Sequence, residues 1–210
     1  NNDHLTKVSK TSYAPQMTIE NSYAYDNSGR LTDIGHNGFF YRNCYNEFGN
    51  LSQVQVGTPS YRQTLGSYSY YGSNGPLKTM TYGNGDTVGY TYDNLDRLQT
   101  VLYNGAESYE YVYDARGNLS KVRSLTGGSD TTYQYDLLDR VTDVFKGSNA
   151  RFRYSYDLMN RGVSTSYTWN GATSTTSNTY DSAGRLYYTT LSNSAKLYTT
   201  YDSLGRVERT

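Results

Sequence analysis

The heptapeptide Tyr180-Asp181-Ser182-Ala183-Gly184-Arg185-Leu186 recurs, with substitutions, through most of the 210-residue sequence. Its general form is Tyr-Asp-x-x-Gly-Arg-Leu-x-x-Val. The nine copies begin at Tyr25, Tyr45, Tyr71, Tyr92, Tyr113, Tyr135, Tyr156, Tyr180 and Tyr201, so successive starts lie 20 to 26 residues apart. Self-similarity at a period of about 20–50 residues is typical of repeat architectures. We therefore predict a single array of small structural units over residues 1–210.

Each motif has the residue chemistry of a tight turn. The second position is Asp in seven of the nine copies, and the fifth position is always Gly, Asp or Asn. These three residues tolerate a left-handed backbone. An Asp carboxylate can also accept a hydrogen bond from the backbone N–H two residues further on. Asp26-Asn27-Ser28-Gly29 and its relatives are therefore predicted to form hairpin tips, each a type I turn closed by a left-handed residue.

The segments between motifs have the alternation of β-strands. Tyr109-Glu110-Tyr111-Val112-Tyr113 places three tyrosines on one face, and Leu31-Thr32-Asp33-Ile34 is typical of the strand that follows a tip. The opposite ends of the hairpins carry two-residue turn signals: Asn84-Gly85, Asn104-Gly105, Gly127-Gly128 and Asn170-Gly171. The predicted fold class is all-β, essentially without helix.

Tandem hairpins of this kind should form one long antiparallel sheet of about 16–18 strands, curled by strand twist into part of a spiralling β-shell. Tyrosines of neighbouring units are expected to stack on one another across the ladder. The composition agrees, because 26 tyrosines accompany a Leu, Ile, Val and Phe content of only about 17%. Such a wall needs no thick aliphatic core.

Charge and composition exclude several classes of protein. The 19 basic and 19 acidic side chains balance, whereas a nucleic-acid binder needs a basic surplus. No apolar stretch is long enough to span a membrane, and the first residues, Asn1-Asn2-Asp3-His4, do not resemble a signal peptide. The single cysteine, Cys44, excludes a disulfide framework.

No set of residues indicates catalysis. Paired carboxylates can hydrolyse a glycoside, but the motif aspartates recur as equals and have a backbone role in every copy. The acidic pairs Asp93/Asp96 and Asp136/Asp139 do not match a calcium loop. We expect His4 and His36 at the surface, Cys44 half-buried, and Trp169 packed at a hairpin. We predict that the protein is not an enzyme and has no cofactor or metal.

The motif arginines, by contrast, form a regular row. They are Arg30, Arg97, Arg140, Arg161, Arg185 and Arg206. We expect them to stack on tyrosines or to pair with the aspartate row.

The strings at Tyr25, Tyr180 and, with Val207 at the leucine position, Tyr201 resemble the YD repeat of the RHS (rearrangement hot spot) family. The resemblance extends from about Tyr23 to Arg209. Relatives include bacterial polymorphic toxins, the C component of insecticidal toxin complexes, and animal teneurins. The resemblance implies a hollow β-shell that, in the toxins, encloses a C-terminal toxin domain.

The sequence departs from complete family members in one respect. It contains no Asp-Pro-x-Gly core motif, because its prolines are Pro15, Pro59 and Pro76. We therefore expect a fragment of a larger RHS protein. The implied partners are the rest of that chain and its toxin or cargo domain, and the implied location is secreted or at the cell surface.

We expect the site residues to be structural. They are Tyr25, Asp26, Gly29, Arg30, Tyr92, Asp93, Arg97, Tyr113, Asp114, Gly117, Tyr135, Asp136, Arg140, Tyr156, Asp157, Arg161, Tyr180, Asp181, Gly184, Arg185, Tyr201, Asp202, Gly205 and Arg206. The alternative function is a binding module for glycans or a cell-surface partner, built on tyrosine rows and Trp169. Unpaired strand edges would also permit edge-to-edge self-association.

Overall fold

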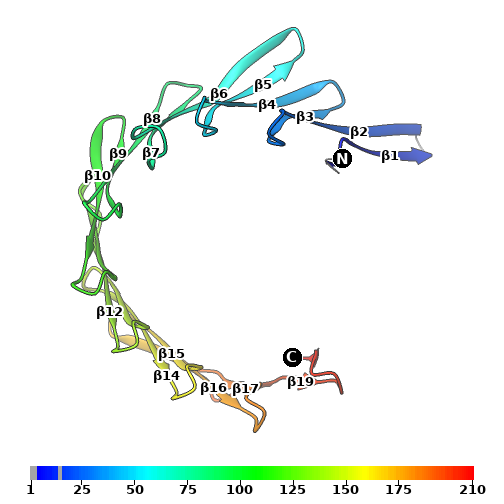
Figure 1. Ribbon diagram of the computed structural model, residues 1–210. Helices are drawn as coiled ribbons and strands as arrows, with labels where there is room; N and C mark the ends of the chain where they lie inside the picture. Colours follow the sequence, from blue (N-terminus) through cyan, green and yellow to red (C-terminus); the bar gives the residue numbers. More distant parts are fainter. Residues whose placement is uncertain (1–3, 14–15) are drawn as a thin grey trace. The chain divides into compact units, whose positions relative to one another are not determined.

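The computed structural model describes residues 4–13 and 16–210 and has no helix among them. Residues 1–3, which the signal-peptide prediction concerned, lie outside the described residues. The chain divides into two compact units, Asn1–Ser108 and Tyr109–Thr210, with the boundary inside strand β10 (Ala106–Tyr113). Figure 1 labels the strands along the chain. The described part offers no helix that could cross a membrane.

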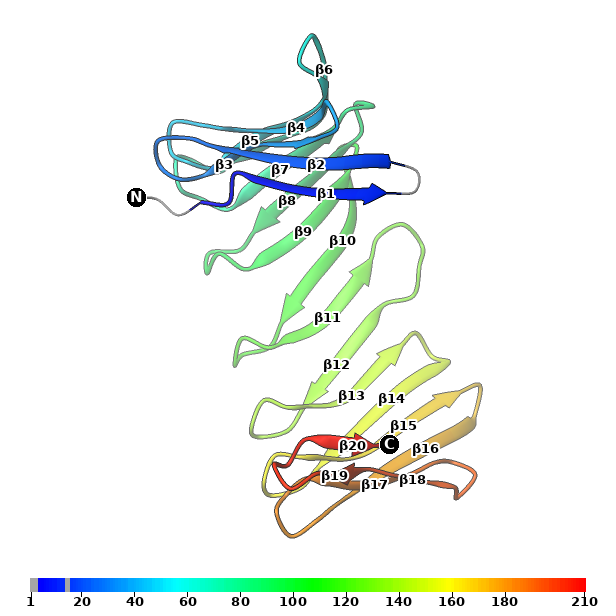
Figure 2. The same ribbon diagram turned by 90° about the vertical axis from the view of Figure 1, so that its right-hand side faces the viewer.

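The first unit holds nine complete strands, which form successive antiparallel hairpins (Figure 2). They are β1 (Lys7–Tyr13), β2 (Gln16–Tyr25), β3 (Leu31–His36), β4 (Phe39–Tyr45), β5 (Leu51–Thr58), β6 (Tyr61–Tyr70), β7 (Leu77–Tyr82), β8 (Thr87–Tyr92) and β9 (Leu98–Tyr103).

The second unit continues the same pattern. Its strands after β10 are β11 (Leu119–Ser124), β12 (Thr131–Tyr135), β13 (Val141–Lys146), β14 (Ala150–Tyr156), β15 (Gly162–Trp169), β16 (Ala172–Tyr180), β17 (Leu186–Thr190), β18 (Lys196–Tyr198), β19 (Thr200–Tyr201) and β20 (Val207–Arg209). Strands β1 to β18 belong to one antiparallel sheet, and β19 and β20 form a separate pair. The predicted fold class, an all-β antiparallel sheet of tandem hairpins, is confirmed.

The two faces of the sheet differ in chemistry, because side chains alternate along each strand. In the first unit, Tyr23, Ile34 and Tyr41 lie opposite one another on an apolar face. The other face carries the neighbouring pair Asp33 and Arg42, whose Nε donates to Asp33 Oδ1 at 2.7 Å.

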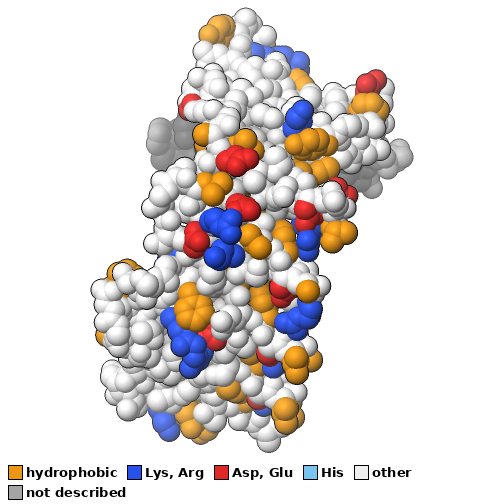
Figure 3. All heavy atoms as spheres, turned by 90° about the vertical axis from the view of Figure 1, so that its left-hand side faces the viewer, with side chains coloured by type: hydrophobic (Ala, Val, Ile, Leu, Met, Phe, Trp, Pro, Cys, Tyr) orange, Lys and Arg blue, Asp and Glu red, His pale blue; other side chains and the backbone are white. Residues whose placement is uncertain are grey.

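The second unit repeats this division. Tyr133, Val144 and Phe152 are in register on its apolar face. On the other face the buried Asp143 pairs with Arg151 and Arg153, from which its Oδ1 accepts hydrogen bonds at 2.6 and 3.1 Å. Figure 3 likewise shows basic side chains next to acidic ones on the drawn surface. Charge is therefore neutralised locally.

The wall is one sheet thick and has little buried core. The buried apolar side chains among the described residues are Val88, Val101 and Ala150. No large side chain in the described part of the chain is fully buried. Stability must therefore come mainly from the strand ladder and from contacts between adjacent repeats, as in other repeat proteins.

Two of the predicted two-residue turns are confirmed. Asn104-Gly105 connects β9 to β10, and Asn170-Gly171 connects β15 to β16; both residues of each turn have positive φ, as a type I′ turn requires. A third turn of this type, Asn37-Gly38 between β3 and β4, was not predicted.

The other two predicted turns are wrong in length. In the connection between β7 and β8 only Gly85 has positive φ, and Tyr82 N donates to Asp86 O at 2.8 Å, so the loop is longer than Asn84-Gly85. Similarly, Gly127 alone is left-handed in the connection that joins Ser124 to Thr131. A Gly-Gly or Asn-Gly pair predicts a turn, but it does not determine how many residues of the loop lie outside the strand pairing.

Candidate functional site

The repeated feature of the molecule is the turn at each motif. At the first motif, Asp26 N donates to Arg30 O and Gly29 N donates to Asp26 O, both at 2.9 Å. The Asp26 carboxylate oxygen Oδ1 accepts hydrogen bonds from the backbone N–H groups of Ser28 (2.9 Å) and Arg30 (3.0 Å). A single side-chain oxygen thus binds two backbone N–H groups of the turn.

The same two side-chain hydrogen bonds recur in both units. They are accepted by Asn46, Asp93, Asp114, Asp136, Asp157, Asp181 and Asp202. These are the hydrogen bonds that the turn chemistry predicts.

The fifth motif position is left-handed in eight of the nine copies, as the residue types there predict; the prediction is wrong at Gly75, where Gly72 has the positive φ of that turn instead. The φ values in those eight copies are 78° at Gly29, 88° at Gly49, 57° at Asp96, 92° at Gly117, 59° at Asp139, 64° at Asn160, 81° at Gly184 and 78° at Gly205. In every copy but the third, the motif tyrosine also coincides with a register shift of its strand, for example between Thr179 and Tyr180. A type I turn followed by a left-handed residue and a bulge produces this shift.

The third motif differs from its sequence assignment. The register shift falls between Ser69 and Tyr70, and the turn hydrogen bond runs from Tyr71 N to Pro76 O at 3.0 Å. Tyr70, not Tyr71, therefore occupies the position of the motif tyrosine. The turn is one residue longer than the others, so matching by residue type selected the wrong one of two adjacent tyrosines.

The motif arginine connects its own turn to the next repeat. Arg161 Nε and Nη2 both lie 2.7 Å from Asp157 Oδ2, and the guanidinium lies over the ring of Tyr180, 4.3 Å from its centroid. Tyr180 in turn donates its hydroxyl to Gly162 O at 2.7 Å. We call this set, the motif Asp and Arg with the tyrosine of the following repeat, the repeat clasp.

The same arrangement recurs at other motifs. Further clasps are Asp26–Arg30–Tyr45, Asp136–Arg140–Tyr156 and Asp181–Arg185–Tyr201. The arginines thus do both things that the sequence predicted, stacking and pairing. The predicted tyrosine-on-tyrosine stacking is wrong at these four tyrosines, because a guanidinium covers the ring instead.

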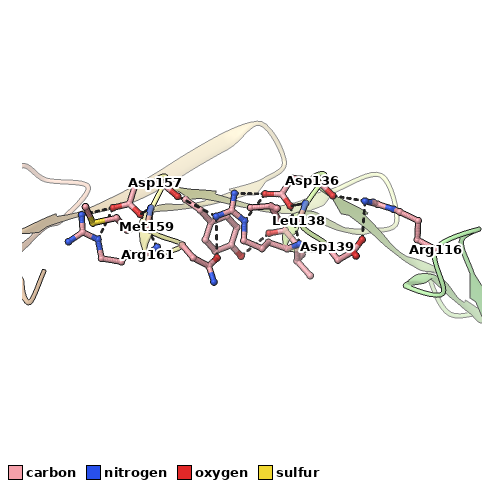
Figure 4. Close-up of polar contacts among 11 residues, drawn as sticks. Arg116, Asp136, Leu138, Asp139, Asp157, Met159 and Arg161 are labelled. Carbon is pink, nitrogen blue, oxygen red and sulfur yellow. Dashed lines mark hydrogen bonds and ion pairs between the residues drawn. The ribbon is translucent and has the colours of Figure 1, made fainter.

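Three successive turns of the second unit are also linked edge to edge. Arg140 Nη1 reaches the next tip, at Asp157 O (3.3 Å) and Asn160 Oδ1 (3.1 Å). Arg116 does the same one repeat earlier, donating to Asp136 O and pairing with Asp139, both at 2.9 Å (Figure 4). This role of Arg116 was not predicted from the sequence. The feature that could have indicated it is Asn118, which occupies the position of the motif arginine in this copy.

The contacts of the turn favour the ionised form of the motif carboxyl groups. The backbone N–H of Arg161, followed by its guanidinium, lowers the pKa of the Asp157 carboxyl below its ordinary value. The pKa values of Asp26, Asp93, Asp136, Asp181 and Asp202 are lowered by the same contacts. Burial, in contrast, raises the pKa of the Tyr92 and Tyr135 hydroxyls. The carboxylates are therefore held in their own turns in the ionised form.

The remaining candidates lie apart from one another. His4 stacks on the Tyr25 ring at 4.5 Å, where an arginine lies in the clasps, and His36 Nδ1 lies 2.7 Å from Asn21 Oδ1. Cys44 is a half-buried free thiol, and Trp169 ends β15 with its ring half exposed. Residues 4–13 and 16–210 contain no group of three or more His, Cys, Asp or Glu that could hold a metal ion.

Residues 113–144 match the family model described as RHS Repeat. No curated protein matches the sequence. Among solved structures, the chain is similar to a chain of the TcdB2-TccC3-Cdc42 crystal structure, with a TM-score of 0.72, 13% identity, and coverage of 96% of this chain and 13% of that one.

Two further structures are similar. The TcdB2-TccC3 crystal structure without its hypervariable C-terminal region gives a TM-score of 0.70 at 15% identity, over 91% of this chain and 12% of that one. The Photorhabdus luminescens Tc holotoxin pore with a TccC3 mutation gives 0.63 at 15% identity, over 91% and 13%. These likenesses establish a shared fold, and the chain spans only about one-eighth of the length of those chains.

Proposed function

We propose that this RHS-repeat chain is a structural, non-catalytic array that forms part of a protective β-shell. The observation that carries the proposal is the repeat clasp. Charged and aromatic side chains that could serve catalysis or binding are instead used, copy after copy, to close turns and to join each repeat to the next. The stability of a repeat protein depends on the interfaces between neighbouring repeats, so motif residues that join one repeat to the next are expected in a structural array.

The shell would belong to a larger secreted or cell-surface RHS protein, in which residues 1–210 form one array of about nine YD repeats. Its partners would be the rest of that chain and an enclosed C-terminal toxin or cargo domain. The fold shared with chains of Tc toxin structures supports this assignment. In this proposal the motif residues listed above are structural site residues.

The proposal is tested in the parent protein. The longest natural reading frame that contains residues 1–210 is expressed, and limited proteolysis measures protection of the downstream segment. A variant that opens two clasps, Arg140→Ala with Arg161→Ala, should make that segment cleavable. The matched control Tyr187→Phe, at an exposed ring outside the clasps, should not. Equal cleavage in the wild type and the clasp variant would contradict enclosure.

A second function is favoured by one specific observation. Phe152 and Tyr167 lie with ring centroids 4.6 Å apart on the apolar face, and the half-exposed Trp169 shares that face two residues beyond Tyr167. Exposed rigid rings can stack on sugars or on a protein partner. A glycan array compared between wild type and Trp169→Ala tests this function, and an array without signals would exclude glycans as its ligands.

A further inference from the structure

Three Asn-Gly turns of the protein have nearly the same backbone. The Asn φ values are 48°, 48° and 47° at Asn37, Asn104 and Asn170, and the following glycines have φ of 83°, 80° and 85°. All three asparagines are exposed. Each forms a two-residue connection of a hairpin, so they differ little in geometry or in access to water.

Their side chains, however, are held differently. Asn37 Oδ1 accepts a hydrogen bond from Glu20 N at 3.1 Å. Asn104 is held twice, because its Oδ1 accepts from Thr87 N at 2.7 Å and its Nδ2 donates to Asp86 Oδ1 at 3.0 Å. Among the residues that the structure describes, no group bonds the carboxamide of Asn170, whose backbone N–H alone is engaged, with Asn149 O at 3.1 Å.

We infer that Asn170 is a site of spontaneous modification, at which the side-chain amide is lost and an aspartate or isoaspartate forms. The Gly171 backbone nitrogen gives up its proton and attacks Asn170 Cγ, so that a bond between them forms. The bond from Cγ to Nδ2 breaks, and the nitrogen leaves as ammonia with that proton. Solvent water then opens the cyclic imide at either carbonyl.

The order of the three sites follows from what must be released before attack. The carboxamide has to rotate toward the following nitrogen, which breaks any hydrogen bond that holds it. The need to break one such hydrogen bond should slow the attack about 2- to 12-fold. Asn170 should therefore react about 2- to 12-fold faster than Asn37, and Asn104, with two bonds, should be the slowest.

Modification at this turn would change the surface near Trp169. The product adds one negative charge to a chain whose formal net charge is zero and whose pI is about 6.9, so it separates as a more acidic species. The isoaspartate form also lengthens the backbone of a two-residue turn that closes the pair of Trp169 and Ala172.

The test is incubation of the folded chain at neutral to mildly alkaline pH, with isoelectric focusing and peptide mapping by mass spectrometry over time. Of the three sites, Asn170 should be the first to appear in modified form. The same measurement in denaturant should bring the three rates together, because the hydrogen bonds are absent. The variant Asp86→Ala should accelerate Asn104 and leave Asn170 unchanged.

Two results would overturn the inference. One is a rate at Asn170 in the folded chain that does not exceed the rates at Asn37 and Asn104. The other is a preference for Asn170 that is equally large in denaturant, which would trace it to neighbouring residues and not to the folded turn.

Discussion

Removing a single hydroxyl from a clasp isolates the bond that joins one repeat to the next. Tyr156→Phe keeps the ring under Arg140 and deletes only the hydrogen bond to Val141 O, which is 2.9 Å long. Tyr180→Phe deletes the 2.7 Å bond to Gly162 O, but that carbonyl keeps a second donor, Asn178 Nδ2, at 3.0 Å. The two variants therefore differ in what they leave unsatisfied.

The expected costs follow from this difference. A hydrogen bond contributes about 0.5–1.5 kcal/mol net, and the loss is larger when a partner is left without a substitute. We expect Tyr156→Phe to lower the free energy of unfolding by about 1–1.5 kcal/mol and Tyr180→Phe by about 0.5 kcal/mol. The double variant should lose about 1.5–2 kcal/mol, because the two bonds share no partner.

Urea unfolding followed by far-ultraviolet circular dichroism measures these values, with unchanged slopes as the check that the same structure unfolds. By thermal unfolding, a loss of 1 kcal/mol corresponds to about 2–4 °C in a chain of this size. Tyr187→Phe, at an exposed ring for which no hydroxyl bond is assigned, should change stability little. The reasoning is refuted if Tyr156→Phe resembles this control, or if Tyr180→Phe is the more costly of the two clasp variants.

Further outcomes are expected. Gly184→Val should destabilise by about 1–2 kcal/mol or more in urea, because φ there is 81°, whereas Gly162→Ala, with open space around its Cβ, should be tolerated. Arg161→Lys keeps the charge but loses the planar contacts, so its midpoint should fall; an unchanged midpoint would show that charge alone suffices. Because folding lowers the Asp157 pKa from an ordinary value of 3.8, stability should be constant above about pH 5 and fall below pH 4 in acid titrations; Asp157→Asn should make that fall smaller without abolishing it, since other motif aspartates share the shift. Leu158→Ser, at a fully exposed tip, should leave stability unchanged and reduce any self-association in light scattering; if association is undiminished, strand edges and not tips mediate it.

The turns were the most predictable part of the structure. Asp26 and Gly29 have a local reason for their identity, since one accepts backbone hydrogen bonds and the other adopts positive φ. Residue preferences that have such local causes can be recognised in a single sequence. For the same reason the strand segments and the absence of helix among the described residues followed from alternation and turn spacing.

The errors concern features that depend on partners distant in sequence. Tyr70 takes the motif position because its hydroxyl meets Leu51 O at 2.8 Å and its strand shifts register there, neither of which adjacent residue types reveal. Asp143 is buried between Arg151 and Arg153 because the ladder pairs it with Arg153 and places Arg151 two residues away on the same face of the neighbouring strand. The loop lengths at Gly85 and Gly127 are likewise set by the ladder and not by the turn residues.

The clasp uses the same three residue types wherever it forms: the Asp and Arg of one motif and the tyrosine that begins the next motif. Copies that carry the motif Asp and Arg could therefore precede any copy with the motif tyrosine without a change of the junction. Unequal crossing-over between such copies in the gene would yield arrays of a different length that still join correctly. The spacing between successive motif tyrosines varies outside the clasp residues, so the array can gain, lose or exchange units while its junctions stay compatible.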